Sequence, residues 1–196
     1  MAASGAVPDI STTHTHRCEP ASALRRGTAR PGTISRMPVE ARLQALGLVL
    51  PAPPKVPPGF QFSFAWTRVR GNRVYVAGHS AQAADGSFSG PFGKVPAEVS
   101  LEAAQTAARD AALSVLASLK RELGDLDRVV AWLMVYGMVN ADAGYPQTTN
   151  VINGFSDLIL ELYGPEVGPR ARIAVGMTAL PLNNAVTIAA EVEIAP

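Results

Sequence analysis

The stretch that decides the fold is residues 171–181, ARIAVGMTALP, which a short turn separates from residues 185–194, AVTIAAEVEI. Both runs are rich in β-branched and small apolar residues, as in strands that lie inside a sheet. The segment between them, 180–184, reads LPLNN and carries the proline and asparagines typical of a turn. We therefore predict strands over 171–179 and 185–194.

Arg172 and Glu191 are charged residues embedded in these apolar strands. A charge inside a sheet is costly unless it is paired or faces a ligand. The forked donors of an arginine match the two oxygens of a carboxylate, and a glutamate can position or deprotonate a water molecule. The pair is thus a candidate ligand site. Alternatively, the two residues neutralise each other as a buried salt bridge or face solvent at an edge.

Two predicted helices flank a third strand earlier in the chain. Residues 100–122 carry apolar side chains at helical spacing behind a serine N-cap, and alanines on this stripe indicate close approach to a sheet. Residues 149–163 carry a second apolar stripe and end before Gly164-Pro165. Between them, residues 128–139 are almost continuously apolar, as expected for a strand that is covered on both faces.

The remaining elements lie before residue 80. Residues 38–46 have the spacing of a short amphipathic helix that ends at Gly47, and the prolines of 50–59 indicate a stiff linker. Residues 60–69 and 73–78, joined through Arg70-Gly71-Asn72, predict a β-hairpin.

This order of elements predicts an α+β fold with a single mixed β-sheet and two helices packed on one face. One layer of helices leaves the other face of the sheet uncovered. Because residues 128–139 are apolar on both sides, we expect another subunit to cover that face. The sequence therefore predicts a homo-oligomer.

Composition excludes several classes of function for this chain of 196 residues. Its formal net charge of +1 gives no field that would gather nucleic acid or anionic membrane, and no apolar run is long enough to span a bilayer. The single cysteine, Cys18, rules out an internal disulfide and a cysteine-ligated metal. We expect no metal and no cofactor, and we assign Asp125 and Asp127 to a solvated helix end.

Residues 1–36 differ in composition from the domain that we predict over 37–196. They are rich in Ser, Thr, Ala, Pro and Arg and poor in acidic residues, so they are expected to be disordered. They are either an organelle transit peptide or an extension upstream of a start at Met37. Without a transit peptide, we expect the protein to be cytoplasmic.

Several motifs resemble the Rid (YjgF) family over residues 52–194. The run 171–181, followed by Val186 and Glu191, looks like the C-terminal signature of that family. GNRVYVAGHSAQ at 71–82 resembles its second-strand motif. VINGFSDLILELYG at 151–164 and ALPLNNAV at 179–186 are similar to a subgroup described as chorismate mutase-like in fold.

The resemblance implies a homotrimer with a cleft at each subunit interface, where reactive 2-imino or enamino acids are hydrolysed to 2-keto acids and ammonia. By this resemblance, Arg172 binds the substrate carboxylate, Glu191 holds the attacking water and the backbone at Gly78 contributes a donor. Asn153 matches a helix asparagine that can face the neighbouring cleft.

Three positions depart from the family pattern. Active members commonly carry tyrosine, serine and cysteine where this chain has Phe64, Ala77 and Ala174. His79 could supply a polar group to the site instead, although a histidine at the end of a strand is otherwise expected at the surface. These departures leave two functions open: an enamine/imine deaminase, or a trimer that binds a small carboxylate for sensing or regulation without turnover. Ribonuclease action is a more distant alternative.

Overall fold

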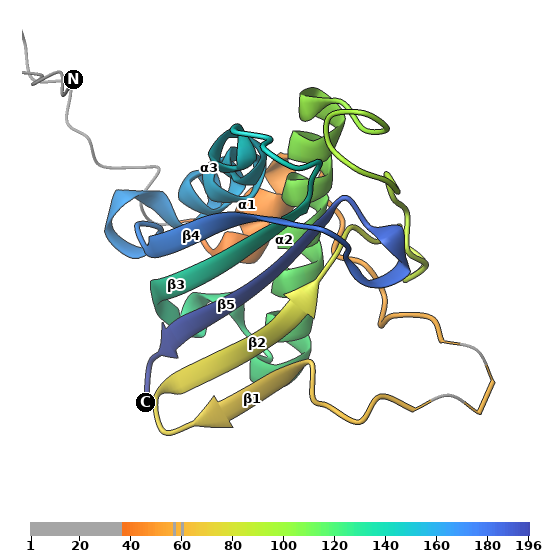
Figure 1. Cartoon of the computed structure of the whole chain (residues 1–196). Coiled ribbons are helices and arrows are strands. Elements are labelled where there is room, and N and C mark those ends of the chain that lie inside the picture. Colours follow the sequence, from red (N-terminus) through yellow and green to blue (C-terminus); the bar gives the residue numbers. More distant parts are fainter. Residues whose placement is uncertain (1–36, 57, 60) are drawn as a thin grey trace, which may run out of the picture. The chain divides into compact units, whose positions relative to one another are not determined.

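The computed structural model describes residues 37–56, 58–59 and 61–196, which form one five-stranded sheet with helices on one side (Figure 1). The expected extension, residues 1–36, lies outside the described residues. In sheet order, the strands are β1 (Thr67–Arg70), β2 (Arg73–His79), β5 (Val186–Ile194), β3 (Val129–Asn140) and β4 (Ala171–Met177).

The sheet is mixed, as predicted. Strands β3 and β4 are parallel, whereas β1–β2, β2–β5 and β5–β3 are antiparallel pairs. The last two strands of the chain are therefore not a hairpin, because β3 lies between them. A parallel pair needs a long crossover, and the helix between β3 and β4 supplies it.

Helix α2 (Leu101–Leu123) begins and ends where its capping residues predict. The Ser100 Oγ accepts a hydrogen bond from the Ala103 N–H at 3.2 Å, and Gly124 ends the helix in the left-handed region with φ 76°. Helix α3 (Thr148–Val167) is interrupted at Gly164, which has φ 73° and ψ −175°, so its regular part stops where the sequence predicts. Helix α1 (Val39–Ala45) is the short predicted helix.

The helices pack closely because small residues face their neighbours. Ala104, Ala108 and Ala111 on α2 are fully buried in the core. A Cβ added to Gly154 on α3 would lie 2.0 Å from the backbone oxygen of Gln105, so the backbones of the two helices are in close contact at this point. Larger residues at these positions would push α2 and α3 apart.

The two faces of the sheet differ. The covered face packs against the helices, and on it Val135 of β3 pairs with Arg172 and Ala190. The neighbouring residue of β3, Met134, points to the opposite, open face, where it pairs with Ala171 and Glu191. No element of the described residues covers the open face, so the expectation that both faces are covered is not met within one chain.

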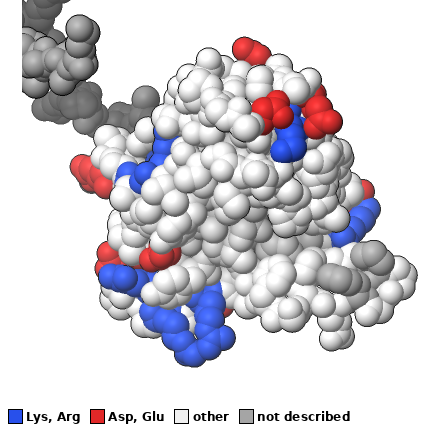
Figure 2. Space-filling view, in the orientation of Figure 1, with Lys and Arg blue, Asp and Glu red and all other residues white. Residues whose placement is uncertain are grey.

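Apolar side chains remain exposed on the open face. They include Tyr75 of β2 and, on β4, Ile173, Val175 and Met177. Figure 2 shows this side of the molecule, with lysine, arginine and acidic side chains gathered near its margins and few of them in the middle. The described part of the chain thus keeps a largely apolar surface on its sheet, with few charges in the middle.

The first strand of the hairpin is shorter than predicted, since β1 begins at Thr67 and residues 61–66 form no strand. The aromatic side chains of this segment pack on one another instead. The ring centroids of Phe62, Phe64 and Trp66 lie 4.9 to 5.0 Å apart in all three pairs. Mutual packing of these rings therefore replaces the ladder that their β-propensity suggested.

A membrane-crossing segment is not found among the helices of the described residues, none of which is long and apolar enough.

Candidate functional site

Arg172 lies on β4, the edge strand, and its side chain turns toward α3. Its Nη1 donates to the Oγ of Ser156 at 2.6 Å, and its Nη2 donates to the Oδ1 of Asn153 at 2.9 Å and to the backbone oxygen of Thr149 at 3.3 Å. The structure therefore brings Arg172 and Asn153 together. Three acceptors fix the orientation of the guanidinium, and all three are neutral.

The charge of Arg172 has no acidic partner within ion-pair distance among the described residues. A second arginine lies nearby, because the charge of Arg172 contributes to lowering the pKa of Arg170. Burial is the larger cause, the charge of Asp157 acts in the opposite direction, and the net pKa of Arg170 is about 10. A half-buried positive charge beside another cation favours an anion such as a carboxylate.

Glu191 lies on the open face, away from Arg172. It accepts a hydrogen bond from the Tyr136 hydroxyl at 2.8 Å, and this bond raises the pKa of Tyr136. Since Arg172 and Glu191 occupy opposite faces, with β3 between their strands, they form no buried salt bridge within one chain. That alternative is wrong, and the two candidate residues are not brought together in a single copy.

A groove beside β2 contains two further predicted site residues, Gly78 and Phe64. Its volume is about 420 Å³, within the range of small-molecule sites. Gly78 lies where the pairing of β2 and β5 shifts register, between Val76 and His79. A Cβ at Gly78 would lie 2.8 Å from the Cγ2 of Thr187, so glycine keeps this part of the groove open.

His79 is buried, with 2% of its surface exposed, so the expectation of a surface position is wrong. Its Nδ1 lies 2.6 Å from the backbone oxygen of Ala77 and its Nε2 lies 2.8 Å from the Oγ of Ser118. Burial lowers the pKa of His79 to about 4, and the nearby charge of Arg121 adds to this effect. The ring is therefore neutral at pH 7.

The hydrogen bonds around His79 form one directed chain. A carbonyl only accepts, so Nδ1–H donates to Ala77 and Nε2 accepts from the Ser118 hydroxyl. Ser118 in turn accepts from Nη2 of Arg121 at 2.8 Å. His79 does not line the groove, but its ring packs against Trp66, which does, at a centroid distance of 4.8 Å.

Two parts of the site were not predicted from the sequence. Ser156 lies three residues after Asn153 on α3, and this helical spacing could have revealed the second acceptor for Arg172. The hydroxyl pair Ser80 and Thr187, whose oxygens are 2.9 Å apart, has no such signal, because only the sheet brings its members together across 107 positions.

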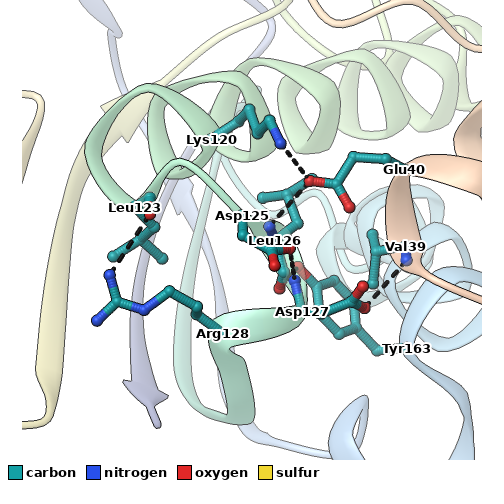
Figure 3. Close-up of polar contacts among 9 residues, drawn as sticks. All are labelled: Val39, Glu40, Lys120, Leu123, Asp125, Leu126, Asp127, Arg128 and Tyr163. Atoms are coloured by element: carbon teal, nitrogen blue, oxygen red, sulfur yellow. Dashed lines mark hydrogen bonds and ion pairs between the residues drawn. The ribbon is translucent and has the colours of Figure 1, made fainter. Parts of the chain in front are cut away.

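An acidic cluster of Glu40, Asp125 and Asp127 lies outside the groove (Figure 3). Glu40 accepts from the Nζ of Lys120 at 2.6 Å and from the Leu126 N–H at 3.0 Å. Asp127 accepts from the N–H of Val39 at 3.0 Å, and Asp125 accepts from the N–H of Asp127. These carboxylates attach α1 to the turn before β3, which is a structural role.

Comparison with known proteins supports a shared fold and ancestry. The chain is 37% identical over 157 residues to Protein TCP17 of Trypanosoma cruzi, covering 80% of this chain and 94% of that protein. It is similar to the solved structure of Atu1372 of Agrobacterium tumefaciens, a protein with unknown function, at 35% identity, TM-score 0.70 and coverage of 80% and 94%.

A second solved structure, that of a proposed endoribonuclease of Shewanella oneidensis, is 25% identical with a TM-score of 0.73. The match covers 81% of this chain and 100% of that one. No protein-family model matches the chain.

Proposed function

The chain belongs to the Rid (YjgF) family, and from that premise we propose that it binds a small carboxylic acid through Arg172, in a cleft that a second copy of the chain completes. The observation that carries this proposal is the Arg172 guanidinium, which neutral groups orient and which has no described carboxylate within ion-pair distance. A bound carboxylate would supply the missing charge.

The need for a second copy follows from where the site residues lie. Arg172 and Asn153 lie between the edge strand β4 and α3, whereas Gly78 and Phe64 lie in the groove beside β2, and the intervening strands separate the two groups. One ligand can contact both groups only if they come from different copies. The exposed apolar residues of the open face support such an assembly, and the family resemblance implies a homotrimer.

Hydrolysis of a 2-imino acid to a 2-keto acid and ammonia is the second candidate function. Glu191 favours it, because this carboxylate faces outward on the open face with a neutral tyrosine as its partner and could hold a water molecule. The side chains at Phe64, Ala77 and Ala174 offer no hydrogen bond to the substrate. Binding of a carboxylic acid is therefore the primary function that we propose, and hydrolysis of an imino acid would depend on Glu191.

The first experiment measures pyruvate binding by titration calorimetry. We expect Arg172→Ala to weaken binding by about 30-fold, because a charge-assisted bidentate contact is lost. Arg172→Lys keeps the charge but loses the fork, so it should recover only part of the affinity. Arg70→Ala, at an exposed arginine of β1, is the control and should bind like wild type. Equal affinity in Arg172→Ala and wild type would refute the proposal.

The second experiment separates binding from turnover. Imines are generated in situ by an amino-acid oxidase, and the release of 2-keto acid is followed against a reaction without this protein. Deamination requires wild type to exceed both Glu191→Gln and Arg172→Ala. If wild type equals Arg172→Ala while pyruvate still binds, the protein is a binding module and the deaminase candidate is dropped.

A further inference from the structure

The groove beside β2 has the lining of a receptor for an aromatic group. Phe62, Phe64, Trp66 and Phe88 contribute to its walls. Phe64 is 50% exposed although it is a large apolar side chain, and its ring stacks on two others rather than entering the core. Rings that already stand edge to face offer a further ring the same favourable geometry.

A strained turn completes the wall of the groove. Leu182, in the turn before β5, has φ 55° and ψ 23°, a left-handed conformation that is uncommon for a leucine, and two thirds of its surface is exposed. The neighbouring Asn183 holds the turn: its carbonyl accepts from the N–H of Gly93 at 2.8 Å, and its side chain accepts from Asn140 at 3.0 Å. Such enforced conformations cluster at ligand sites.

The groove is also lined by two hydroxyl groups, those of Ser80 and Thr187, and one of their hydrogens is not used in the bond between them. The Oγ of Ser80 and the Oγ1 of Thr187 are 2.9 Å apart, and both side chains are buried. Two hydroxyls carry two hydrogens, and their mutual bond uses one of them. The other hydrogen has no acceptor among the described residues. A ligand that presents an acceptor beside Gly78 would satisfy it.

We propose that the ligand of this protein is a 2-oxo or 2-imino acid with an aromatic side chain, whose ring occupies the groove and whose oxo or imino group accepts the spare hydrogen of the Ser80–Thr187 pair. This inference rests on the proposed function, since the carboxylate is assigned to Arg172 of a second copy. Lys55 also lines the groove, but Asp85 pairs with its charge, so the carboxylate anchor remains Arg172.

Titration calorimetry with two stable acids, phenylpyruvate and pyruvate, tests the proposal on the full chain. Phenylpyruvate should bind about 30-fold more tightly, because only its ring removes the apolar groove from water. Phe64→Ala should weaken phenylpyruvate about fivefold and weaken pyruvate by a smaller factor. Phe92→Ala is a matched control, since Phe92 is 49% exposed and does not line the groove, and it should change neither affinity.

The hydroxyl pair is tested by the double variant Ser80→Ala/Thr187→Val, which removes both partners and leaves no orphaned group, so the fold should hold. Loss of one hydrogen bond should weaken both acids by about fivefold. Unchanged affinities in this variant would overturn the assignment of the pair to the ligand.

Other outcomes separate the two proposals. If both acids bind equally and both depend on Arg172, the aromatic substrate class is wrong while the proposed function stands. If the affinity for phenylpyruvate is unchanged in Arg172→Ala but lower in Phe64→Ala, the carboxylate anchor is refuted and the groove remains the binding site for the ring. If neither acid binds, both proposals fail. Equal affinities together with a smaller assembly in Phe64→Ala would assign the groove to a second copy and overturn the inference.

Discussion

The two faces of the sheet differ in how completely their polar groups are hydrogen-bonded within the chain. On the covered face, both nitrogens of His79 are bonded, and α3 supplies three acceptors to Arg172. On the open face, Glu191 has a single described partner, Tyr136, and Ser80–Thr187 retains an unused hydrogen beside the groove. Polar groups on the covered face are thus fixed by the chain itself, whereas those on the open side still have capacity for water, a ligand or another subunit.

Apolar residues follow the same division. The side chains of β3 that face the helices, such as Trp132 and Val135, are almost completely buried, while those of β4 on the other face remain exposed. Burial of an apolar side chain contributes about 2 kcal/mol, so a whole exposed strand face is a large unused driving force. The covered face therefore stabilises the single chain, and we expect the open face to be buried in an assembly.

The strongest way to break this division is to place a charge on the open face. Ile173→Lys should convert the oligomer to a smaller species at micromolar concentration, because an interface would have to bury an unpaired ammonium. Ile173 is 44% exposed, and Leu160 on α3 is 42% exposed, so Leu160→Lys is a matched control away from the sheet. Sedimentation velocity gives the size of each variant.

The division would fail if Leu160→Lys also reduced the size of the assembly, or if neither variant did. In the first case α3 would be part of the interface, and in the second the open face would be free in solution.

The covered face can be tested by adding one methyl group. Gly154→Ala should destabilise the protein by about 3 kcal/mol, because the new Cβ meets a backbone oxygen of α2 that cannot rotate away. Gly176→Ala on β4 is the control: its Cβ would lie 3.4 Å from the nearest atom, an ordinary contact, and should change stability by less than about 1 kcal/mol. Urea unfolding measures both, and equal midpoints would show that α2 and α3 are not packed as closely as described.

Periodicity and caps were sufficient to predict the helices and most strands. Ser100 and Gly124 locate α2 because capping is a local interaction. The apolar run of β3 is also a local signal, and it marks a central strand. Strand order was not predictable, because nothing local tells β5 to insert between β2 and β3. The aromatic segment 61–66 misled the hairpin prediction, since tertiary packing overrode its β-propensity.

The site was predicted only in part for a related reason. Arg172 and Glu191 were recognisable as charges in apolar strands. Alternation within one strand, however, does not show whether its residues share a face of the sheet with given residues of another strand. Only the cross-strand register shows that they lie on opposite sides. For His79, the irregular pairing after Val76 changes the face that simple alternation would assign, so burial followed from a bulge that the sequence did not mark.

The last and smallest effect concerns the buried histidine of the covered face. The pKa of His79 is lowered to about 4 in the folded protein from an ordinary 6.5, mainly by burial. The unfolded chain therefore binds a proton first as the pH falls, so the stability that neutral His79 provides is complete above pH 6.5 and declines toward pH 4. Between pH 7 and pH 5 the loss should be about 2 kcal/mol.

Urea unfolding at the two pH values, on wild type and His79→Phe, isolates this contribution. The variant keeps a ring against Trp66 but cannot titrate, so it should be less stable than wild type at pH 7, and its own loss on acidification should be smaller by that same amount. Parallel losses in both proteins would mean that position 79 takes up protons equally when folded and unfolded. His79 would then be accessible to water, and the covered face would not be closed at the point where it supports the groove.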